Sequence, residues 1–355
     1  MDFVKTSGGS FTLNGKPFRF LGANVYELAS LESSITKQVI ADSAEAGFKA
    51  LRFWLFENKT LAEQIKKLHE ICDAVKPYGI KLVISLADKW GYLQNYKIDE
   101  KWYIKGYRNE YLKYVTAVTG EFKERSEIMI WELINEPETD NFNVFYEFTK
   151  TVSEEIKNVN ENHLLSVGTV GGVGDKFGSY LSVFNKSNFK KLYSLNSLDA
   201  VSLHDYSYDS GVFERLDILY RFKGELKKAE RYSAIGKAIE KPFAGLDGYY
   251  LKKGKLIRFP LTLRWLWNIY NNRDTGFAKS ISKPVYIGEI GFKNIPGRNR
   301  VKIMEIDIKN KFESGIDGIM LWSFEAQGWN KDGHDYGFGQ GEGFEEVVKK
   351  WNKNI

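Results

Sequence analysis

Cysteine is almost missing from this sequence. The one residue of this type, Cys72, excludes an intrachain disulfide and lies in an apolar helical stretch, where we expect a buried thiol. Long apolar runs are missing as well: no stretch of about 18 apolar residues occurs, so we expect no membrane span. The start, MDFVKTSGGS, lacks the charged-then-apolar pattern of a secretory signal. We therefore expect either an intracellular protein or a secreted one whose leader has been removed.

A concentrated basic patch is also missing. The 51 Lys and Arg residues are scattered and exceed the 46 Asp and Glu residues by only five. Nucleic-acid-binding proteins usually gather their basic residues on one surface, so we expect no nucleic-acid partner. The four histidines, at 69, 163, 204 and 334, show no metal-ligand spacing. The glycine-rich segment 168–174 opens no helix at the spacing of a dinucleotide site, so we expect neither a metal nor a cofactor.

Aromatic residues, by contrast, are abundant. The chain has 24 Phe, 20 Tyr and 9 Trp, together 15% of its 355 residues. Apolar residues make up 43% and charged residues 27%, which is close to a globular average and allows a sizeable core. Many aromatic residues belong to that core. A surplus also suits a protein that stacks against flat ligand faces, such as those of sugars.

Eight short apolar runs predict strands, and amphipathic segments such as 33–47, 61–79 and 144–160 lie between them. Most runs are continuously apolar and bordered by Gly, Asp or Asn, which is typical of parallel strands covered on both faces. The alternation predicts an α/β fold, a single (β/α)8 TIM barrel over residues 1–355. The runs cover 18–26, 49–56, 80–87, 127–134, 163–170, 199–206, 283–290 and 317–324.

The connection after the sixth run is too long for one crossover helix. We interpret residues 207–260 as an insertion over the active-site face of the barrel. It contains a charged helical stretch, 212–240, and then the segment 242–256. Residues 262–272 follow as the sixth barrel helix.

The first residues of the chain predict a small hairpin. The segments FVKTSGG and SFTLNGK (3–16) pair around Asn14-Gly15, a dipeptide that favours tight hairpin turns. We expect this hairpin to close the bottom of the barrel.

Polar residues stand near the carboxyl ends of several predicted strands, where barrel enzymes carry their chemistry. Glu136 and Glu289 follow the fourth and seventh runs and should face each other across the barrel mouth. Two carboxylates so placed are typical of glycoside hydrolysis: one stays protonated for the leaving oxygen, and the other stays ionised to attack the anomeric carbon. The polar positions are Arg52, Asp88-Lys89-Trp90, Asn135-Glu136-Pro137, His204-Asp205-Tyr206, Glu289 and Trp322.

The segments around both glutamates resemble those of a known family. WELINEPE (131–138) resembles the acid/base motif of glycoside hydrolase family 5, within the clan of retaining barrel glycosidases, and YIGEIG (286–291) resembles its nucleophile motif. LRFW, HDY and LWSF stand at the family's arginine, His-x-Tyr and tryptophan positions in the right order, and the resemblance covers essentially the whole chain. The segments FTLNGKPFRFLGANVYEL and SLADKWGYLQNY are similar to the β-mannanase branch.

The resemblance implies a role for the two glutamates and their neighbours. Glu136 is the expected acid/base and Glu289 the expected nucleophile, with carboxyl groups about 5–5.5 Å apart. Tyr206 should hydrogen-bond to Glu289. Arg52 should lie beneath Glu289 and keep it anionic, because a nearby cation favours the charged form.

Further residues are expected to contact the substrate or tune the site. Asn135 should reach the 2-hydroxyl of the sugar, a contact that strengthens in the transition state. His204 should lie near the acid/base. Trp322 is the expected sugar platform at the cleavage subsite, and Trp90 and Trp329 are further platform candidates.

Each of these residues also has a structural alternative, such as a core ion pair or plain packing. Glu132, Glu138 and Glu325 are competing carboxylates, and Glu132 is expected to point toward the barrel wall or interior. The substrate implied is β-1,4-linked mannan or a manno-oligosaccharide. Alternatives are an exo-acting β-mannosidase or β-glucosidase, a cellulase-type β-1,4-glucanase and, more remotely, a barrel that binds carbohydrate without cleaving it.

Overall fold

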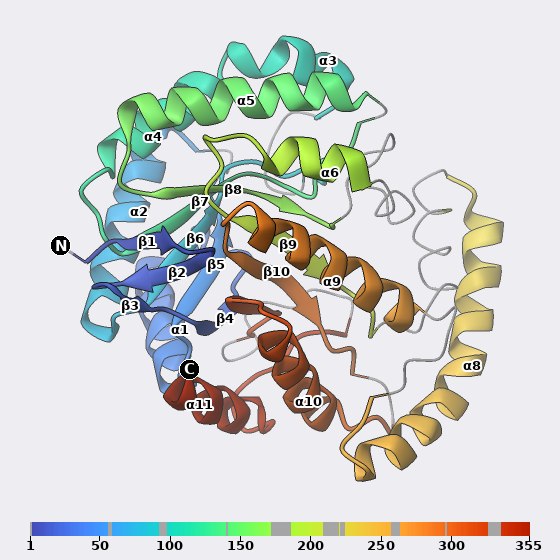
Figure 1. Cartoon of the computed structure of the whole chain (residues 1–355). Coiled ribbons are helices and arrows are strands. Elements are labelled where there is room, and N and C mark those ends of the chain that lie inside the picture. Colours follow the sequence, from blue (N-terminus) through green and yellow to red (C-terminus); the bar gives the residue numbers. More distant parts are fainter. Residues whose placement is uncertain are drawn as a thin grey trace.

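The computed structural model describes residues 2–55, 59–91, 98–139, 141–171, 186–208, 220, 224–256, 263–294, 297–325 and 335–355. Eight parallel strands close into a barrel, in which each strand pairs with the next along the chain and the last pairs with the first (Figure 1). They are β4 (Phe20–Asn24), β5 (Ala50–Trp54), β6 (Lys81–Ser85), β7 (Ile128–Asn135), β8 (Leu164–Thr169), β9 (Val201–Asp205), β10 (Val285–Gly291) and β11 (Gly318–Trp322). Each strand falls on one predicted run, which confirms the TIM barrel.

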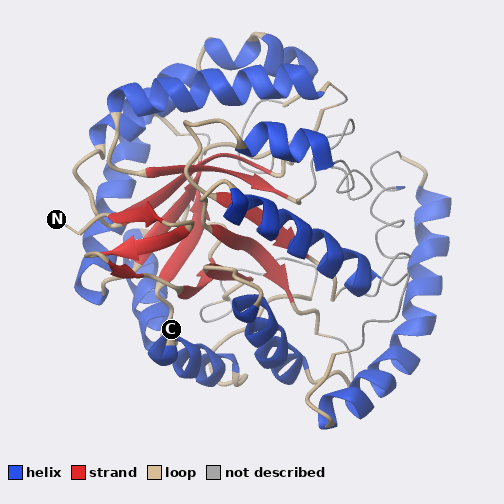
Figure 2. Cartoon of the chain, in the orientation of Figure 1, coloured by secondary structure: helices blue, strands red, loops and turns tan. Residues whose placement is uncertain are grey.

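Helices surround these strands (Figure 2). They are α1 (Ser33–Glu45), α2 (Leu61–Val75), η1 (Lys76–Tyr78), α3 (Glu100–Ile104), η2 (Gly106–Arg108), α4 (Tyr111–Glu121), α5 (Phe142–Val159), α6 (Lys186–Tyr193), α8 (Leu226–Lys252), α9 (Leu263–Ser280), α10 (Arg300–Glu313) and α11 (Phe344–Asn354). Helices α1, α2 and α5 fall on the three predicted amphipathic segments, and α9 on the predicted sixth barrel helix. In the part of the chain that the structure describes, no helix combines the length and apolar character needed to span a bilayer.

Local signals in the sequence determine where α2 begins and ends. The Thr60 hydroxyl accepts the backbone N–H of Glu63 at 3.3 Å, and the Glu63 carboxylate accepts the backbone N–H of Thr60 at 2.8 Å. This reciprocal capping box satisfies two N–H groups that the first turn leaves unpaired. At the other end, the short η1 follows α2, and Gly79 ends it with a φ of 67°, a left-handed conformation that glycine adopts without a steric penalty. The chain can therefore turn from η1 into β6.

The N-terminal strands cover the end of the barrel where the barrel strands begin. Strands β1 (Val4–Ser7), β2 (Ser10–Leu13) and β3 (Lys16–Pro17) form a separate antiparallel sheet. The two predicted segments do pair, as β1 and β2, but their turn lies at Gly8-Gly9. The turn at Asn14-Gly15 instead joins β2 to β3. Phe11 packs into the barrel floor, 6.0 Å from the ring of Phe20 and 6.2 Å from that of Tyr286. The opposite end of the barrel therefore carries the polar site.

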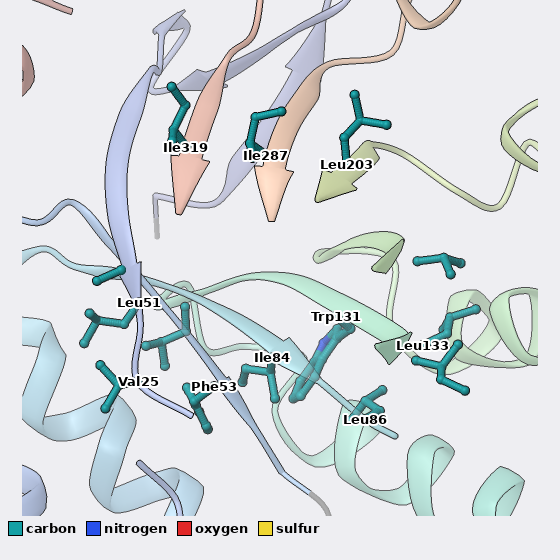
Figure 3. Close-up of a cluster of buried hydrophobic side chains, with 14 of the residues drawn as sticks. Val25, Leu51, Phe53, Ile84, Leu86, Trp131, Leu133, Leu203, Ile287 and Ile319 are labelled. Atoms are coloured by element: carbon teal, nitrogen blue, oxygen red, sulfur yellow. The ribbon is translucent and has the colours of Figure 1, made fainter. Parts of the chain in front are cut away.

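Side chains alternate along the strands between the outer core and the barrel interior. On β5, Leu51 and Phe53 lie in the core shared with the helices (Figure 3), so Arg52 between them points into the barrel. On β7, Trp131 and Leu133 lie in the same core and place Glu132 inward. A separate apolar cluster fills the interior near the floor. The buried polar side chains consequently lie above that floor.

The segment after β9 contains the long helix α8. The sequence predicted a charged helical stretch over 212–240, with the separate segment 242–256 after it. The helix instead continues through Pro242 to Lys252. In Figure 1, α8 lies on the side toward which the strand arrowheads point. Residues 209–219, 221–223 and 257–262 are outside the described residues, and the assignment of 207–260 as an insertion over the active site stays a prediction.

Candidate active site

Arg52 is the centre of a buried polar network inside the barrel. Its guanidinium donates to Glu132 Oε2 at 2.8 Å and to Glu289 Oε1 at 2.7 Å. It also donates to Asn24 Oδ1 at 2.9 Å and to Asn135 Oδ1 at 2.8 Å. Burial opposes the charged guanidinium, but the charges of Glu132 and Glu289 outweigh burial and raise the pKa of Arg52. The network thus places a permanent cation beneath the carboxyl ends of the strands.

Glu289, on β10, is held at both carboxylate oxygens. Arg52 donates to Oε1, and the Tyr206 hydroxyl donates to Oε2 at 2.6 Å. His204 Nδ1 lies 3.6 Å from the same Oε2. Burial and the charge of Glu289 raise the pKa of Tyr206 well above its usual range, so this phenol remains a donor. Donors at both oxygens favour the ionised carboxylate, the form that a nucleophile requires.

A β-bulge turns Glu289 toward the barrel interior. Ile287 lies in the outer core, and regular alternation would point Glu289 the same way. The register between β10 and β9 shifts between these two residues, which reverses the direction of the second. A Cβ at Gly288 would lie 2.5 Å from Ser202 Oγ and 3.0 Å from His204 Nε2. Glycine at 288 is therefore what lets the bulge pack against β9.

Glu136 follows β7 directly and has different surroundings. Its φ of 42° lies in the left-handed region, which is uncommon for a residue with a side chain. The indole N–H of Trp90 donates to Oε2 at 2.8 Å, and His204 Nδ1 lies 2.9 Å from Oε1. Glu289 thus bonds to a guanidinium and a phenol, whereas Glu136 bonds to an indole and an imidazole. Unequal surroundings are what separate the roles of two neighbouring carboxyl groups.

Asn135, the last residue of β7, has its side-chain amide held from two sides. Its Oδ1 accepts from Arg52 at 2.8 Å, and its Nδ2 donates to Asp88 Oδ1 at 3.0 Å. Asp88 lies just beyond β6 and is 1% exposed. Burial raises the pKa of Asp88 to about 7, and the charges of Glu136 and Glu289 act in the same direction. The network therefore extends from the guanidinium to a second, buried carboxyl group.

The two glutamates lie close together. One carboxylate oxygen of Glu136 and one of Glu289 are within 4.8 Å of each other and of a ring nitrogen of His204. Three such groups could surround a metal ion, but Arg52 and Tyr206 already donate to Glu289 and would compete with a cation. The separation instead fits retaining glycosidases, whose carboxyl groups are about 5–5.5 Å apart, rather than inverting ones at about 6.5–9.5 Å.

A comparison with protein families decides the identity. The family model described as cellulase, glycosyl hydrolase family 5, matches residues 11–245. The chain belongs to glycosyl hydrolase family 5. The match begins in β2 and ends within α8, so it includes Arg52, Asn135, Glu136, His204 and Tyr206. Glu289 lies beyond it.

Relatives of this family 5 chain include mannan-degrading enzymes. Mannan endo-1,4-beta-mannosidase F of Aspergillus fumigatus is 28% identical over an alignment of 249 positions, which covers 59% of this chain and 57% of that relative. The chain thus spans just over half the length of that relative. Among solved structures, the endo-1,4-beta-mannanase of Rhizomucor miehei has a TM-score of 0.72 at 19% identity and covers 99% of this chain and 98% of its own. The endo-beta-1,4-mannanase of Thermotoga petrophila has a TM-score of 0.67 at 20% identity and covers 96% of this chain and 77% of its own. Both structures share the barrel fold.

The aromatic platform candidates have different positions. Trp322, at the end of β11, is half-buried and packs edge-on against Trp54 at 5.6 Å and Tyr26 at 6.2 Å. Trp90 is half-buried too, and its N–H is directed to Glu136. Trp329 lies outside the described residues. The predicted site residues that the structure brings into one polar network of hydrogen bonds and ion pairs are Arg52, Trp90, Asn135, Glu136, His204, Tyr206 and Glu289.

The competing carboxylates have other partners. Glu132 points into the barrel interior as predicted, where it bonds to Arg52 and accepts the Tyr286 hydroxyl at 2.5 Å. Glu138 pairs with the ammonium group of Lys89. Glu325 is half-buried beyond the end of β11.

Two residues of the network had no role in the sequence-based prediction. Asn24 accepts from Arg52 and donates through Nδ2 to the carbonyl of Gly288 at 3.0 Å. Asp88 holds Asn135. Both are polar residues at or just beyond the carboxyl end of a buried strand, which is the signal that identified the other site residues.

Proposed function

We propose that this chain is a retaining β-glycoside hydrolase that cleaves β-1,4-linked mannan or manno-oligosaccharides. The observation that carries the proposal is the pair Glu136 and Glu289, whose nearest oxygens lie within 4.8 Å and whose partners differ. Membership of glycosyl hydrolase family 5 supports the reaction class. The non-catalytic alternative would require one of these carboxylates to be lost, and both stand in the network.

The two steps of the reaction follow from these surroundings. Glu289, kept ionised by Arg52 and Tyr206, attacks the anomeric carbon and forms a covalent glycosyl-enzyme. Glu136 donates its proton to the leaving oxygen as the glycosidic bond breaks. It then takes a proton from the water that hydrolyses the intermediate, which restores both carboxyl groups. Asn135 hydrogen-bonds to the 2-hydroxyl, a contact that strengthens in the transition state.

Mannan is the proposed substrate because the curated relatives are named mannan endo-1,4-beta-mannosidases. A cellulase-type β-1,4-glucanase is the second candidate, since the matching family model is described as cellulase. Hydrolysis of mannan, glucomannan, carboxymethyl-cellulose and an aryl β-mannoside in parallel separates the two. Turnover of carboxymethyl-cellulose alone would contradict the proposed specificity.

We further propose that segment 207–260 covers one end of the substrate groove. It leaves the barrel after β9, the strand that leads into Tyr206, and α8 lies toward the carboxyl ends of the strands (Figure 1). A covered groove favours short oligosaccharides or chain ends over internal bonds. Steady release of mono- or disaccharide from a long mannan, with little loss of viscosity, is the expected result. A rapid fall in viscosity with mixed oligomers would contradict the cover.

The stereochemistry and two variants test the mechanism. Proton NMR of the first-formed sugar should show the β anomer, and an α product would exclude retention. Glu289→Ala should abolish turnover, with partial rescue by azide or formate in place of the missing nucleophile. Glu136→Ala should keep some activity on aryl glycosides whose leaving group needs no proton. If instead azide or formate rescued Glu136→Ala and Glu289→Ala kept activity on such aryl glycosides, Glu136 would be the nucleophile and Glu289 the acid/base.

A further inference from the structure

We propose that Asp88 is a positioning residue for the glycosidase reaction: its carboxylate fixes the orientation of the Asn135 amide, so that an amide N–H faces the 2-hydroxyl of the sugar. The inference rests on the proposed function, since it assigns a task within that reaction. Neither the family motifs nor the comparisons give Asp88 a role.

The partners of Asn135 determine which way its amide points. Arg52 can only donate, so the amide atom that faces it at 2.8 Å is the oxygen. The amide atom that faces Asp88 at 3.0 Å is then the nitrogen, which donates to the carboxylate. Among the described residues, Asp88 is the one acceptor recorded for this nitrogen, so its second hydrogen is available to a substrate hydroxyl. Without the carboxylate, the nitrogen end of the amide would lose the acceptor that holds it in place.

The backbone keeps Asp88 in register with Asn135. The two residues form a parallel bridge that extends the pairing of β6 with β7. The N–H of Asn135 donates to the carbonyl of Ala87 at 2.8 Å, and the N–H of Lys89 donates to the carbonyl of Asn135 at 3.2 Å. The backbone N–H of Trp90 also bonds to the Asp88 carboxylate. A side chain held this firmly can preorganise its neighbour before the substrate arrives.

The cost of burying Asp88 argues that the carboxyl group has a task. It is 1% exposed, and burial together with the nearby charges of Glu136 and Glu289 raises its pKa to about 7. A buried carboxyl group that neighbours two others opposes folding unless something compensates. Perturbed carboxyl groups of this kind concentrate at functional sites. The hydrogen bond from Asn135, the residue that precedes Glu136, gives Asp88 such a task.

A double-mutant cycle tests whether Asp88 acts through Asn135. The substrate is an aryl β-mannobioside, and the variants are Asp88→Ala, Asn135→Ala and the double variant. Each single variant should lower kcat by about 10- to 100-fold with little change in KM, the effect of losing one hydrogen bond to a charged group. The double variant should be no worse than Asn135→Ala by more than about 2-fold. Multiplied losses in the double variant would overturn the inference.

A substrate without the 2-hydroxyl isolates the contact itself. On the matching aryl glycoside with a 2-deoxy sugar at the cleavage site, Asp88→Ala should lose less than about 2-fold relative to wild type. Mannose and glucose differ only at C2, so their 2-deoxy forms are the same sugar, and this experiment does not depend on which one the enzyme prefers. An equal loss on both substrates would overturn the inference.

Two further variants distinguish positioning from folding. Asp88→Asn keeps a carbonyl acceptor and should recover part of the kcat that Asp88→Ala loses. Asp317→Asn is the matched control: it changes another buried aspartate, 2.5 Å from Lys279 at the opposite end of the barrel, and should leave the dependence on the 2-hydroxyl unchanged. If wild type hydrolyses neither the aryl β-mannobioside nor mannan, glucomannan or carboxymethyl-cellulose, the proposed function fails and the inference with it. If wild type is active and the fold-losses in kcat of the two single variants multiply in the double variant, only the inference fails.

Discussion

The indole N–H of Trp90 donates to Oε2 of Glu136 over 2.8 Å. A tryptophan N–H can only donate, and a donor at a carboxylate favours its ionised form. In Trp90→Phe the protonated acid should therefore persist to higher pH, which moves the alkaline limb of kcat/KM upward. The measurement is a pH profile of wild type and variant on an oligosaccharide. Trp322→Phe is the control: it should change KM but leave the alkaline limb of kcat/KM where it is in wild type.

That result separates two roles for Trp90. If the limb stays in place while KM rises, Trp90 acts as a sugar platform and its bond to Glu136 has no catalytic effect.

Tyr206→Phe removes the hydroxyl that donates to Glu289 at 2.6 Å and keeps the ring. Arg52 still neutralises the carboxylate, so the variant should fold and bind substrate normally. We expect kcat to fall by about 10- to 100-fold with KM changed less than about 2-fold, because a hydrogen bond to a charged group is lost. Steady-state kinetics on manno-oligosaccharides measure both. A rise in KM at constant kcat would show that Tyr206 serves binding instead.

The sequence predicted the barrel well because its strands carry an unambiguous pattern. All five residues of β6 are buried, and such continuous runs form parallel strands covered on both faces. Glu136 and Glu289 could be predicted as site residues because a carboxylate at the carboxyl end of a barrel strand lies at the barrel mouth, where barrel enzymes carry their chemistry. Placing them within one network required the three-dimensional register.

Several details depend on tertiary contacts that no local pattern records. Regular alternation would turn Glu289 outward, and the bulge at Gly288 that reverses it depends on the close approach of β9. From the sequence alone, Trp90 could serve equally well as a sugar platform or as a hydrogen-bond donor to another side chain. The continuation of α8 through Pro242 overrides the local preference of proline. For Glu289 and Trp90, a segment that is distant in sequence decides the outcome.

Lys311→Met should destabilise the protein strongly. Lys311, on α10, lies 2.5 Å from Asp205 Oδ2 at the end of β9, and both side chains are nearly buried. Burial would raise the pKa of Asp205, but the charge of Lys311 outweighs it and lowers that pKa. Removing the cation leaves an uncompensated buried charge, so the free energy of unfolding should fall by about 3–5 kcal/mol.

Urea denaturation at pH 7 measures this loss. The control is Lys309→Met on the same helix, whose exposed ammonium lies 3.8 Å from Glu313 and should contribute less than about 0.5 kcal/mol. Equal effects of the two variants would mean that the Asp205 pair contributes no more than a surface pair.

His163 should make the stability depend on pH. The ring is 1% exposed, and burial lowers its pKa to about 3. Trp131 Nε1 donates to His163 Nδ1 at 2.9 Å, and Nε2 lies 2.9 Å from the carbonyl oxygen of Arg125. Nδ1 is therefore an acceptor and the proton resides on Nε2, which describes a neutral ring. In the unfolded chain the same ring takes up a second proton near pH 6.5.

The sign of the effect follows from these two values. The pKa of His163 is lower in the folded state, so the unfolded state binds more protons between about pH 3 and pH 6.5. The contribution of the neutral ring to the free energy of unfolding is therefore complete above about pH 6.5 and is lost as the pH falls toward 3. At pH 5 the loss is about 2 kcal/mol. Urea unfolding of wild type and His163→Gln at pH 7 and pH 5 measures it. The free energy of unfolding falls from pH 7 to pH 5 in both proteins, and the fall should be about 2 kcal/mol smaller in the variant. The carboxyl groups contribute equally to both proteins, so they do not affect this comparison. Equal differences would show that His163 is accessible to protons in the folded state.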